Sequence, residues 1–156
     1  MELDFSKKIA TSKAAADCIP GLINLAVAYR GAQLMAHSSH HFISGPTFFE
    51  DHEFLGELYG TYEEAYDGLI EKIIGLGGTI DITSVTTKAC AVGSSFNPQG
   101  KSAAEIFSAI YAVEKQFCVL ISSALTAGCT NGVQNFLQGL CDEAEHRQYK
   151  IGQKLK

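Results

Sequence analysis

In the stretch "FFEDHEFLGELYGTYEEAYDGLIEKIIGL", residues 48–76, apolar side chains recur every three or four positions. They form a single stripe of a long amphipathic helix: Leu55, Leu58, Tyr59, Tyr62, Tyr66, Leu69, Ile70 and Ile73. The glycines of "GLGG", residues 75–78, are a typical helix end. The stretch therefore predicts a helix from about Phe48 to Leu76.

A first helix precedes this stretch. Pro20 suits a first helical turn, and Asp17 lies close enough to cap that turn. From there the helical spacing of apolar residues continues to about His41. The residues before this helix, 1–17, are expected to form a flexible N-terminal tail.

Two further helices follow the central stretch. Ser102 and Glu105 have the spacing of a capping box, which predicts a helix that starts there and ends at Gly128. The last helix is expected from about Thr130 to the C-terminus. Four long helices with two short connections predict an all-α, four-helix bundle.

The third connection of the bundle is long. Residues 79–101, between the second and third helices, exceed the length of a plain turn. A connection of this length crosses the bundle, contributes to an interface or contains a short helix of its own. A single long crossover at this point is a feature of ferritin-like bundles. We therefore expect residues 1–156 to form one ferritin-like domain.

Composition excludes several classes of protein. Hydrophobic residues make up 46% of the chain and charged residues 19%, which fits a soluble globular protein. The net charge of −5 argues against a surface that coats nucleic acid by itself. No apolar run approaches the length of a membrane span, and the N-terminus lacks the apolar core of a signal peptide. The scattered cysteines indicate reduced thiols, packed mostly as small hydrophobic residues, in a cytoplasmic protein: Cys18, Cys90, Cys118, Cys129 and Cys141.

A cluster of histidines suggests metal chemistry. Four of the five histidines lie within residues 37–52, and imidazole with carboxylate is a common ligand set for divalent metals. Asp67 and Glu71 are spaced i, i+4, so both carboxylates can face one ion. His52, however, precedes Asp67 by roughly 22 Å along the helix axis. The sequence therefore favours either separate minor sites or a metal site shared by two antiparallel chains across a two-fold interface.

The run "HHFISGPTFFEDHEFLGELYGTYEEAYDGLIEKIIGLGG", residues 40–78, resembles the signature of the Dps family (DNA-protection-during-starvation proteins), the mini-ferritins. The resemblance is weaker elsewhere within residues 20–152, where "CTNGVQNFL" and "EAEHRQY" look like the opening and the end of the family's last helix. The matched positions of the signature are His40, Gly45, Pro46, Phe48, Phe49, His52, Leu58, Tyr59, Asp67, Glu71 and Lys72.

The resemblance implies a hollow shell of twelve subunits, a homo-oligomer that stores ferric iron and protects against oxidative damage. It implies a ferroxidase, an enzyme that oxidises Fe(II) with hydrogen peroxide or oxygen at centres between two-fold related subunits. Carried over by position, His40 and His52 come from one subunit, and Asp67 and Glu71 come from its neighbour. The same ligands also suit Zn or Mn as the resident ion.

The chain departs from the family at two positions near this centre. Gly56 stands where the family has a third carboxylate, four residues after His52. Glu63, one turn before Asp67, is a candidate replacement, and the alternative is that Glu63 is simply solvated. His41 stands in place of a family tryptophan and is either a further ligand or a neighbour of the site.

Two alternative functions follow from these departures. One is a Dps-like shell protein that keeps the fold without efficient iron oxidation, because Gly56 cannot ligate a metal. The other is DNA compaction, which some family members achieve with lysine-rich tails. Here Lys7 and Lys8 are interleaved with acidic residues, and the basic C-terminal segment 150–156 is short. Since nonspecific DNA affinity needs many phosphate contacts, we expect DNA binding to be weak or absent.

Overall fold

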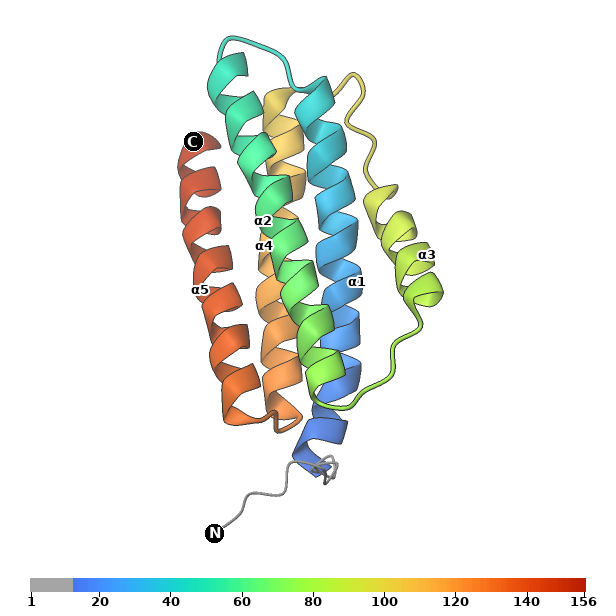
Figure 1. The fold of residues 1–156 in the computed structure, drawn as a ribbon. Helices are drawn as coiled ribbons and strands as arrows, with labels where there is room; N and C mark the ends of the chain where they lie inside the picture. Colours follow the sequence, from blue (N-terminus) through green and yellow to red (C-terminus); the bar gives the residue numbers. More distant parts are fainter. Residues whose placement is uncertain (1–12) are drawn as a thin grey trace.

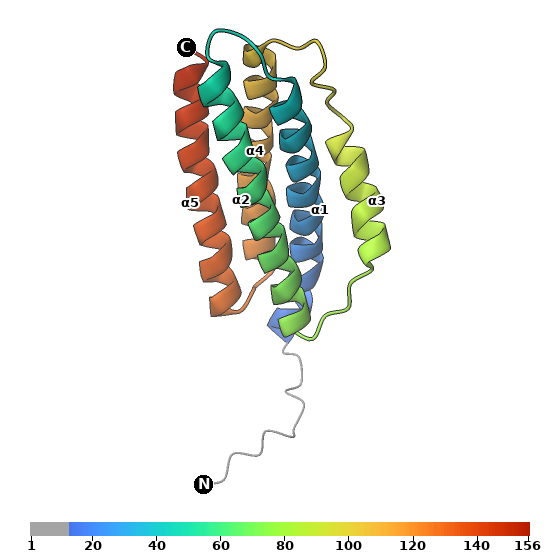
Figure 2. The ribbon, with the colours of Figure 1, turned by 45° about the horizontal axis from the view of Figure 1, so that its top comes forward.

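The computed structural model of the chain describes residues 13–156. This part contains five helices and no strand: α1 (Lys13–Phe42), α2 (Phe48–Gly75), α3 (Ile82–Gly93), α4 (Ala103–Thr126) and α5 (Asn131–Lys154). Four long helices form the bundle, and α3 lies outside it against α1 (Figures 1 and 2). The crossover lets α2 and α4 run in the same direction (Figure 1). The predicted ferritin-like bundle, with a short helix in its crossover, is confirmed.

The predicted bounds of α2 are also confirmed, since the helix begins at Phe48 and ends at Gly75. Its end is fixed by Gly77, whose φ of 78° is one that glycine adopts without strain. The amides of Gly77 and Gly78 donate to the carbonyls of Ile74 and Ile73, both at 2.9 Å. These bonds satisfy carbonyls that the helix itself leaves without partners.

The start of α1 differs from the prediction. The helix already includes Lys13, so Asp17 is an exposed residue within it and not its cap. Pro20 also lies inside the helix, where it cannot donate to the Ala16 carbonyl four residues earlier. The helix nevertheless continues through this gap in its hydrogen bonds. Residues 1–12 of the expected tail, which include Lys7 and Lys8, lie outside the described part. Residues 13–17, also expected in the tail, belong to α1.

The predicted capping box opens α4 as expected. The Glu105 amide donates to Ser102 Oγ at 3.2 Å, and the Ser102 amide donates to Glu105 Oε2 at 2.9 Å. The hydrogen bonds from Ser102, joined by the neighbouring Lys101, lower the pKa of Glu105 to about 2. At the other end, Gly128 has a φ of 85° and separates α4 from α5.

A buried ion pair crosses the bundle core between α4 and α5. Arg147 donates from Nε to Glu114 Oε1 at 2.6 Å, and the hydroxyl of Tyr62 donates to the same oxygen at 2.5 Å. Glu114 is fully buried, and burial raises the pKa of its carboxyl while Arg147 opposes that rise. The sequence carries a signal for this pair, because both charges lie on the apolar stripes of their helices.

Two glycines allow α3 to approach α1 closely. A Cβ on Gly31 would lie 2.5 Å from Val92, and one on Gly93 would lie 2.8 Å from Leu34 Cβ. Side chains at either position would push the helices apart. This contact explains how the crossover helix packs on the bundle.

The expectation that the cysteines are reduced is wrong for one pair. Cys18 of α1 and Cys129, in the turn after α4, form a disulfide and are both buried. A partner 111 residues away in the chain cannot be recognised from sequence spacing alone. Disulfides are rare in a reducing cytosol, so this bond does not support the predicted cytoplasmic location. That location stays a prediction. Cys90, Cys118 and Cys141 are free thiols.

Among the described residues, one helix, α4, is long and apolar enough to span a membrane by length and composition alone. Its apolar residues, however, pack in the bundle core, and it carries the buried Glu114. We therefore interpret α4 as the core helix of a soluble fold.

Candidate metal centre

Two predicted ligands, His40 and His52, lie side by side where α1 ends and α2 begins. Their ring centroids are 3.7 Å apart. His40 Nδ1 is 2.9 Å from the backbone carbonyl of His52. A carbonyl can only accept, so Nδ1 is the donor in this contact and Nε2 takes no part in it. Histidines that bind a metal commonly donate their other ring N–H to a carbonyl in this way.

Gly56 packs directly against the His40 ring that makes this contact. A Cβ at position 56 would lie 3.3 Å from His40 Cε1 and 3.4 Å from Nδ1. Any other side chain would therefore press on the ring and displace it by a few tenths of an ångström. In the sequence, Gly56 stands where a carboxylate ligand is expected. In the structure, it packs against the ring of His40.

The other histidines of the cluster surround this pair. The ring of His37 lies 4.4 Å from that of Tyr59 and 4.8 Å from that of His41, measured between centroids. His41 is exposed, and His37 is half-buried. Neither imidazole stacks as closely on His40 as His52 does.

Sequence reasoning missed the contacts that fix the start of α2. Asp51 is buried and pairs with Lys154 of α5 at 2.6 Å. The hydroxyl of Thr47 donates to the second oxygen of Asp51 at 2.7 Å. These contacts join the end of α5 to the first turn of α2 and thereby hold the backbone of the adjacent His52. The sequence shows only an acidic residue beside a histidine, which does not reveal a partner in another helix.

The predicted carboxylates Asp67 and Glu71 lie further along α2, and both are exposed. Fifteen residues of helix separate Asp67 from His52, a distance of roughly 22 Å along the axis. The described chain thus brings the two histidines together but not the histidines and these carboxylates. Glu63 already has a partner, since Arg30 Nη1 lies 3.3 Å from its Oε1.

An exposed aromatic patch adjoins the histidine pair. We define the Phe patch as Phe48 and Phe49, whose exposed fractions are 37% and 82% and whose ring centroids lie 5.5 Å apart. The ring of Phe48 lies 5.1 Å from that of His52 between centroids. Phenylalanines gathered on a surface mark a region that another molecule covers.

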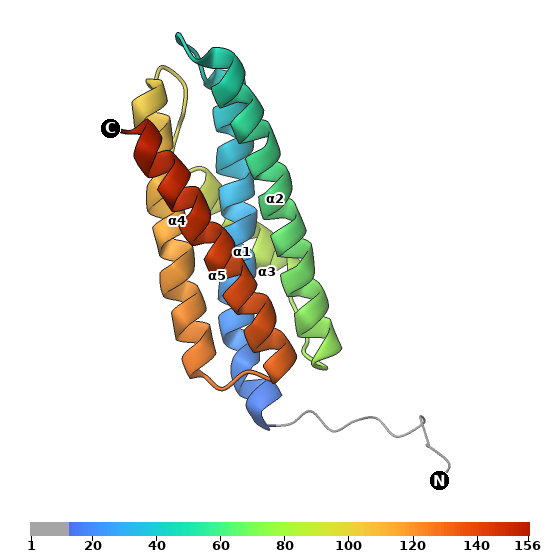
Figure 3. The ribbon, with the colours of Figure 1, turned by 90° about the vertical axis from the view of Figure 1, so that its left-hand side faces the viewer.

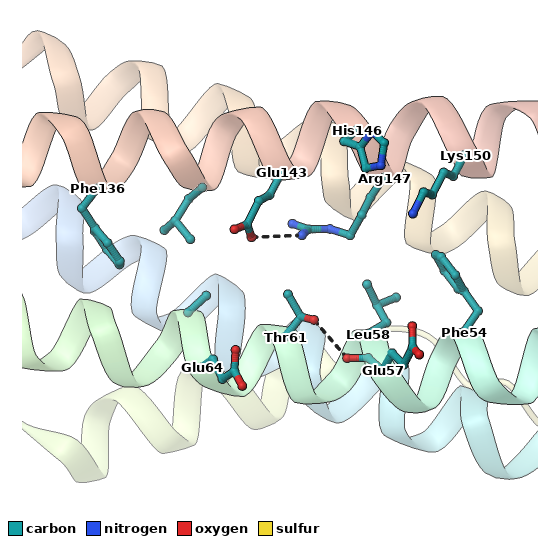
Figure 4. Close-up of a pocket in the computed structure, with 12 residues that line it drawn as sticks. Phe54, Glu57, Leu58, Thr61, Glu64, Phe136, Glu143, His146, Arg147 and Lys150 are labelled. Atoms are coloured by element: carbon teal, nitrogen blue, oxygen red, sulfur yellow. Dashed lines mark hydrogen bonds and ion pairs between the residues drawn. The ribbon is translucent and has the colours of Figure 1, made fainter.

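A separate cleft of about 500 Å³ opens between α2 and α5. Figure 4 shows Glu57 and Glu64 of α2 facing Glu143, Arg147 and Lys150 of α5 across it. None of the four predicted ligands lines this cleft. The histidine pair therefore lies outside it, on a surface open to solvent.

Four long helices with a helical crossover define a ferritin-like bundle, and solved structures share this fold. A Dps protein from Bacillus brevis is 19% identical, with a TM-score of 0.82 over 94% of this chain and 100% of that one. Antigen TpF1 from Treponema pallidum is 17% identical, with a TM-score of 0.79 over 97% and 99%.

The family follows from the sequence match. The family model of the ferritin-like domain matches residues 25–156, and this chain belongs to that family. No curated protein sequence matches the chain. A Dps protein from Vibrio cholerae O1, described as a member of a broad superfamily of ferritin-like diiron-carboxylate proteins, is 16% identical, with a TM-score of 0.67 over the full length of both chains. The predicted resemblance to the Dps family is thus confirmed at the level of the fold.

Proposed function

We propose that this protein is a mini-ferritin, which oxidises Fe(II) with hydrogen peroxide or oxygen and stores the ferric product in a hollow shell of twelve copies. In this proposal His40 and His52 of one copy and Asp67 and Glu71 of a second copy hold the iron substrate. The carboxylates favour the ferric product, because they offset the charge that the ion gains on oxidation. Protection against oxidative damage follows, since peroxide is consumed together with Fe(II).

The observation that carries the proposal is the state of the histidine pair. The His52 carbonyl accepts from His40 Nδ1, which leaves Nε2 available to a metal beside a second imidazole. A surface pair of histidines with no ligand would gain little from such an arrangement. Two imidazoles alone hold iron weakly, so the centre needs carboxylates from elsewhere.

A second copy of the chain supplies the missing carboxylates in this proposal. Asp67 and Glu71 are exposed on α2, the helix that also carries His52. They lie too far along this helix to share a metal ion with the histidines of their own chain. When two α2 helices pack antiparallel, the early part of one meets the late part of the other. The Phe patch beside His52 offers apolar surface that such an interface would bury.

Assembly gives the first test of the proposal. Twelve copies of a 16.8 kDa chain have a mass of about 200 kDa, and closed symmetric oligomers persist on dilution. We expect light scattering at micromolar concentration to give that mass. A mass near 16.8 kDa would contradict both the shell and the shared centre.

The role of position 56 gives a second test. We expect Gly56→Asp to raise the rate of Fe(II) oxidation by peroxide, because the new carboxylate lies next to His40 and one helical turn after His52. The matched control is Gly56→Asn, which displaces the His40 ring to the same extent without adding charge. Stopped-flow oxidation of Fe(II) measures both variants.

Three outcomes of this test have different meanings. A faster Asp variant with a slower or unchanged Asn variant supports a centre that lacks one carboxylate. If Glu63 already fills that place, Glu63→Gln alone abolishes oxidation and Gly56→Asp changes little. If none of the three substitutions changes the rate, the alternative function is the better one, a shell protein without efficient iron oxidation. The absence of a carboxylate at position 56 is the observation that favours this alternative.

A further inference from the structure

Two of the free cysteines lie together on the side of the bundle formed by α4 and α5, which run next to each other in Figure 3. Cys118 belongs to α4, and Cys141 belongs to α5 with Glu145 one turn later. Their two sulfurs and a carboxylate oxygen of Glu145 all lie within 4.8 Å of one another. Both thiols are half-buried, whereas Glu145 is exposed.

We propose that Cys118, Cys141 and Glu145 form a second metal site, for a thiophilic cation such as Zn²⁺, independent of the iron chemistry. Zinc takes four ligands in a tetrahedron, and sites with three protein ligands keep the fourth position for water. Zn–S bonds of about 2.3 Å place two sulfurs about 3.8 Å apart. The observed cluster needs to contract by only about 1 Å, which small rotations of the side chains supply.

The surroundings of the cluster also suit thiolate ligands. Gln148 Nε2 lies 3.3 Å from Cys118 Sγ and 3.3 Å from the Glu114 carbonyl, so it holds the sulfur in place and can donate to it. A bound cation would also offset the negative charge that two thiolates and a carboxylate bring together.

Access distinguishes this site from a structural zinc site in a core. Glu145 is exposed and both thiols are only half-buried, so a cation reaches the cluster without opening the bundle. The ligands also differ in kind from the imidazoles and carboxylates of the iron centre. Thiolates select soft or borderline-soft cations, whereas Fe(II) in the proposed centre has nitrogen and oxygen ligands.

Cobalt(II), a spectroscopic substitute for zinc, tests the site in the assembled protein. After mild reduction and removal of the reductant under anaerobic conditions, we expect a thiolate-to-cobalt charge-transfer absorption that saturates at one cobalt per chain. Added Zn²⁺ should abolish this absorption. Cys118→Ser and Cys141→Ser should each remove most of it, and Glu145→Gln should weaken cobalt binding by about tenfold or more.

Two controls keep the test specific. Cys90→Ser removes an exposed thiol on α3 and should leave the absorption unchanged. The Asp67→Asn, Glu71→Gln double variant should also retain it, because nitrogen and oxygen ligands give no such band. The proposal is overturned if no charge-transfer band forms, if the band survives both Cys118→Ser and Cys141→Ser, or if the two thiols form a disulfide that mild reduction opens without creating a cobalt site.

Discussion

Replacing Arg147 with methionine lowers the free energy of unfolding by about 3–5 kcal/mol, because it leaves the buried charge of Glu114 without its ionic partner. Methionine retains most of the apolar stem of arginine, so the loss reflects charge and not volume. Tyr62 still donates to Glu114 in this variant, but one hydroxyl cannot replace a guanidinium at 2.6 Å. Denaturant unfolding at matched protein concentration measures the change, since assembly affects apparent stability.

The cost of Arg147→Met should depend on pH in a defined direction. Burial already raises the pKa of Glu114 in the folded protein, and loss of Arg147 raises it further. A carboxyl whose folded pKa exceeds its unfolded pKa favours folding at low pH and loses that contribution as pH rises through the folded pKa. We therefore expect a smaller deficit at about pH 5 than at about pH 8.

Two further variants separate the buried pair from the surface charge beside it. Glu143→Gln removes the other acidic partner of Arg147, which lies 3.5 Å away with its side chain 58% exposed. Such a surface pair contributes at most about 1 kcal/mol. Glu114→Gln combined with Arg147→Met removes both buried charges and should restore much of the loss. If Arg147→Met costs no more than Glu143→Gln, the ion pair is not a major support of the core.

Replacing Asp67 with asparagine and Glu71 with glutamine should reduce Fe(II) binding and oxidation by about 100-fold or more. Mutating a residue that only contacts a metal ligand already costs about 10- to 100-fold in metal affinity or activity, and here two ligands themselves are removed. The substitutions keep the shape of both side chains. Assembly should be intact, since both residues are exposed and the buried stripe of α2 is unchanged. Fe(II) titration, stopped-flow oxidation and light scattering on one preparation distinguish lost chemistry from lost assembly.

The matched control for this double variant is Glu57→Gln with Glu64→Gln, two exposed carboxylates of the same helix that line the α2–α5 cleft. It removes the same amount of charge without touching a predicted ligand. Equal losses in both double variants would indicate a general effect of surface charge. Unchanged binding in Asp67→Asn, Glu71→Gln would place the metal site elsewhere, with the cluster of His37, His40 and His41 as the next candidate.

Local patterns in the sequence predicted most of the fold. The apolar stripe of α2, the capping box of Ser102 and Glu105 and the terminating Gly77 are interactions between residues close in the chain. Patterns of this kind can be recognised without knowing the rest of the molecule. The one local error, the start of α1, arose because Pro20, a residue common in a first helical turn, here lies about two turns inside the helix.

Contacts between distant residues could not be predicted in the same way. The disulfide of Cys18 and Cys129 and the ion pair of Asp51 and Lys154 each join segments about a hundred residues apart. The family resemblance assigned His40 and His52 to one subunit, and the structure places their rings side by side, but the resemblance did not reveal the hydrogen bond from His40 to the His52 carbonyl. The packing of that ring against Gly56 likewise required the structure.

A mixed assembly distinguishes a metal centre built from two copies of the chain from one built within a single copy. One variant carries His40→Ala and His52→Ala, the other carries Asp67→Asn and Glu71→Gln, and each alone should be inactive. When the two are co-assembled in equal amounts, half of the pairs are mixed, and one of the two sites in each mixed pair has all its ligands. A shared centre therefore predicts recovery of roughly a quarter of the wild-type rate of Fe(II) oxidation. No recovery, with exchange of subunits verified, would contradict it.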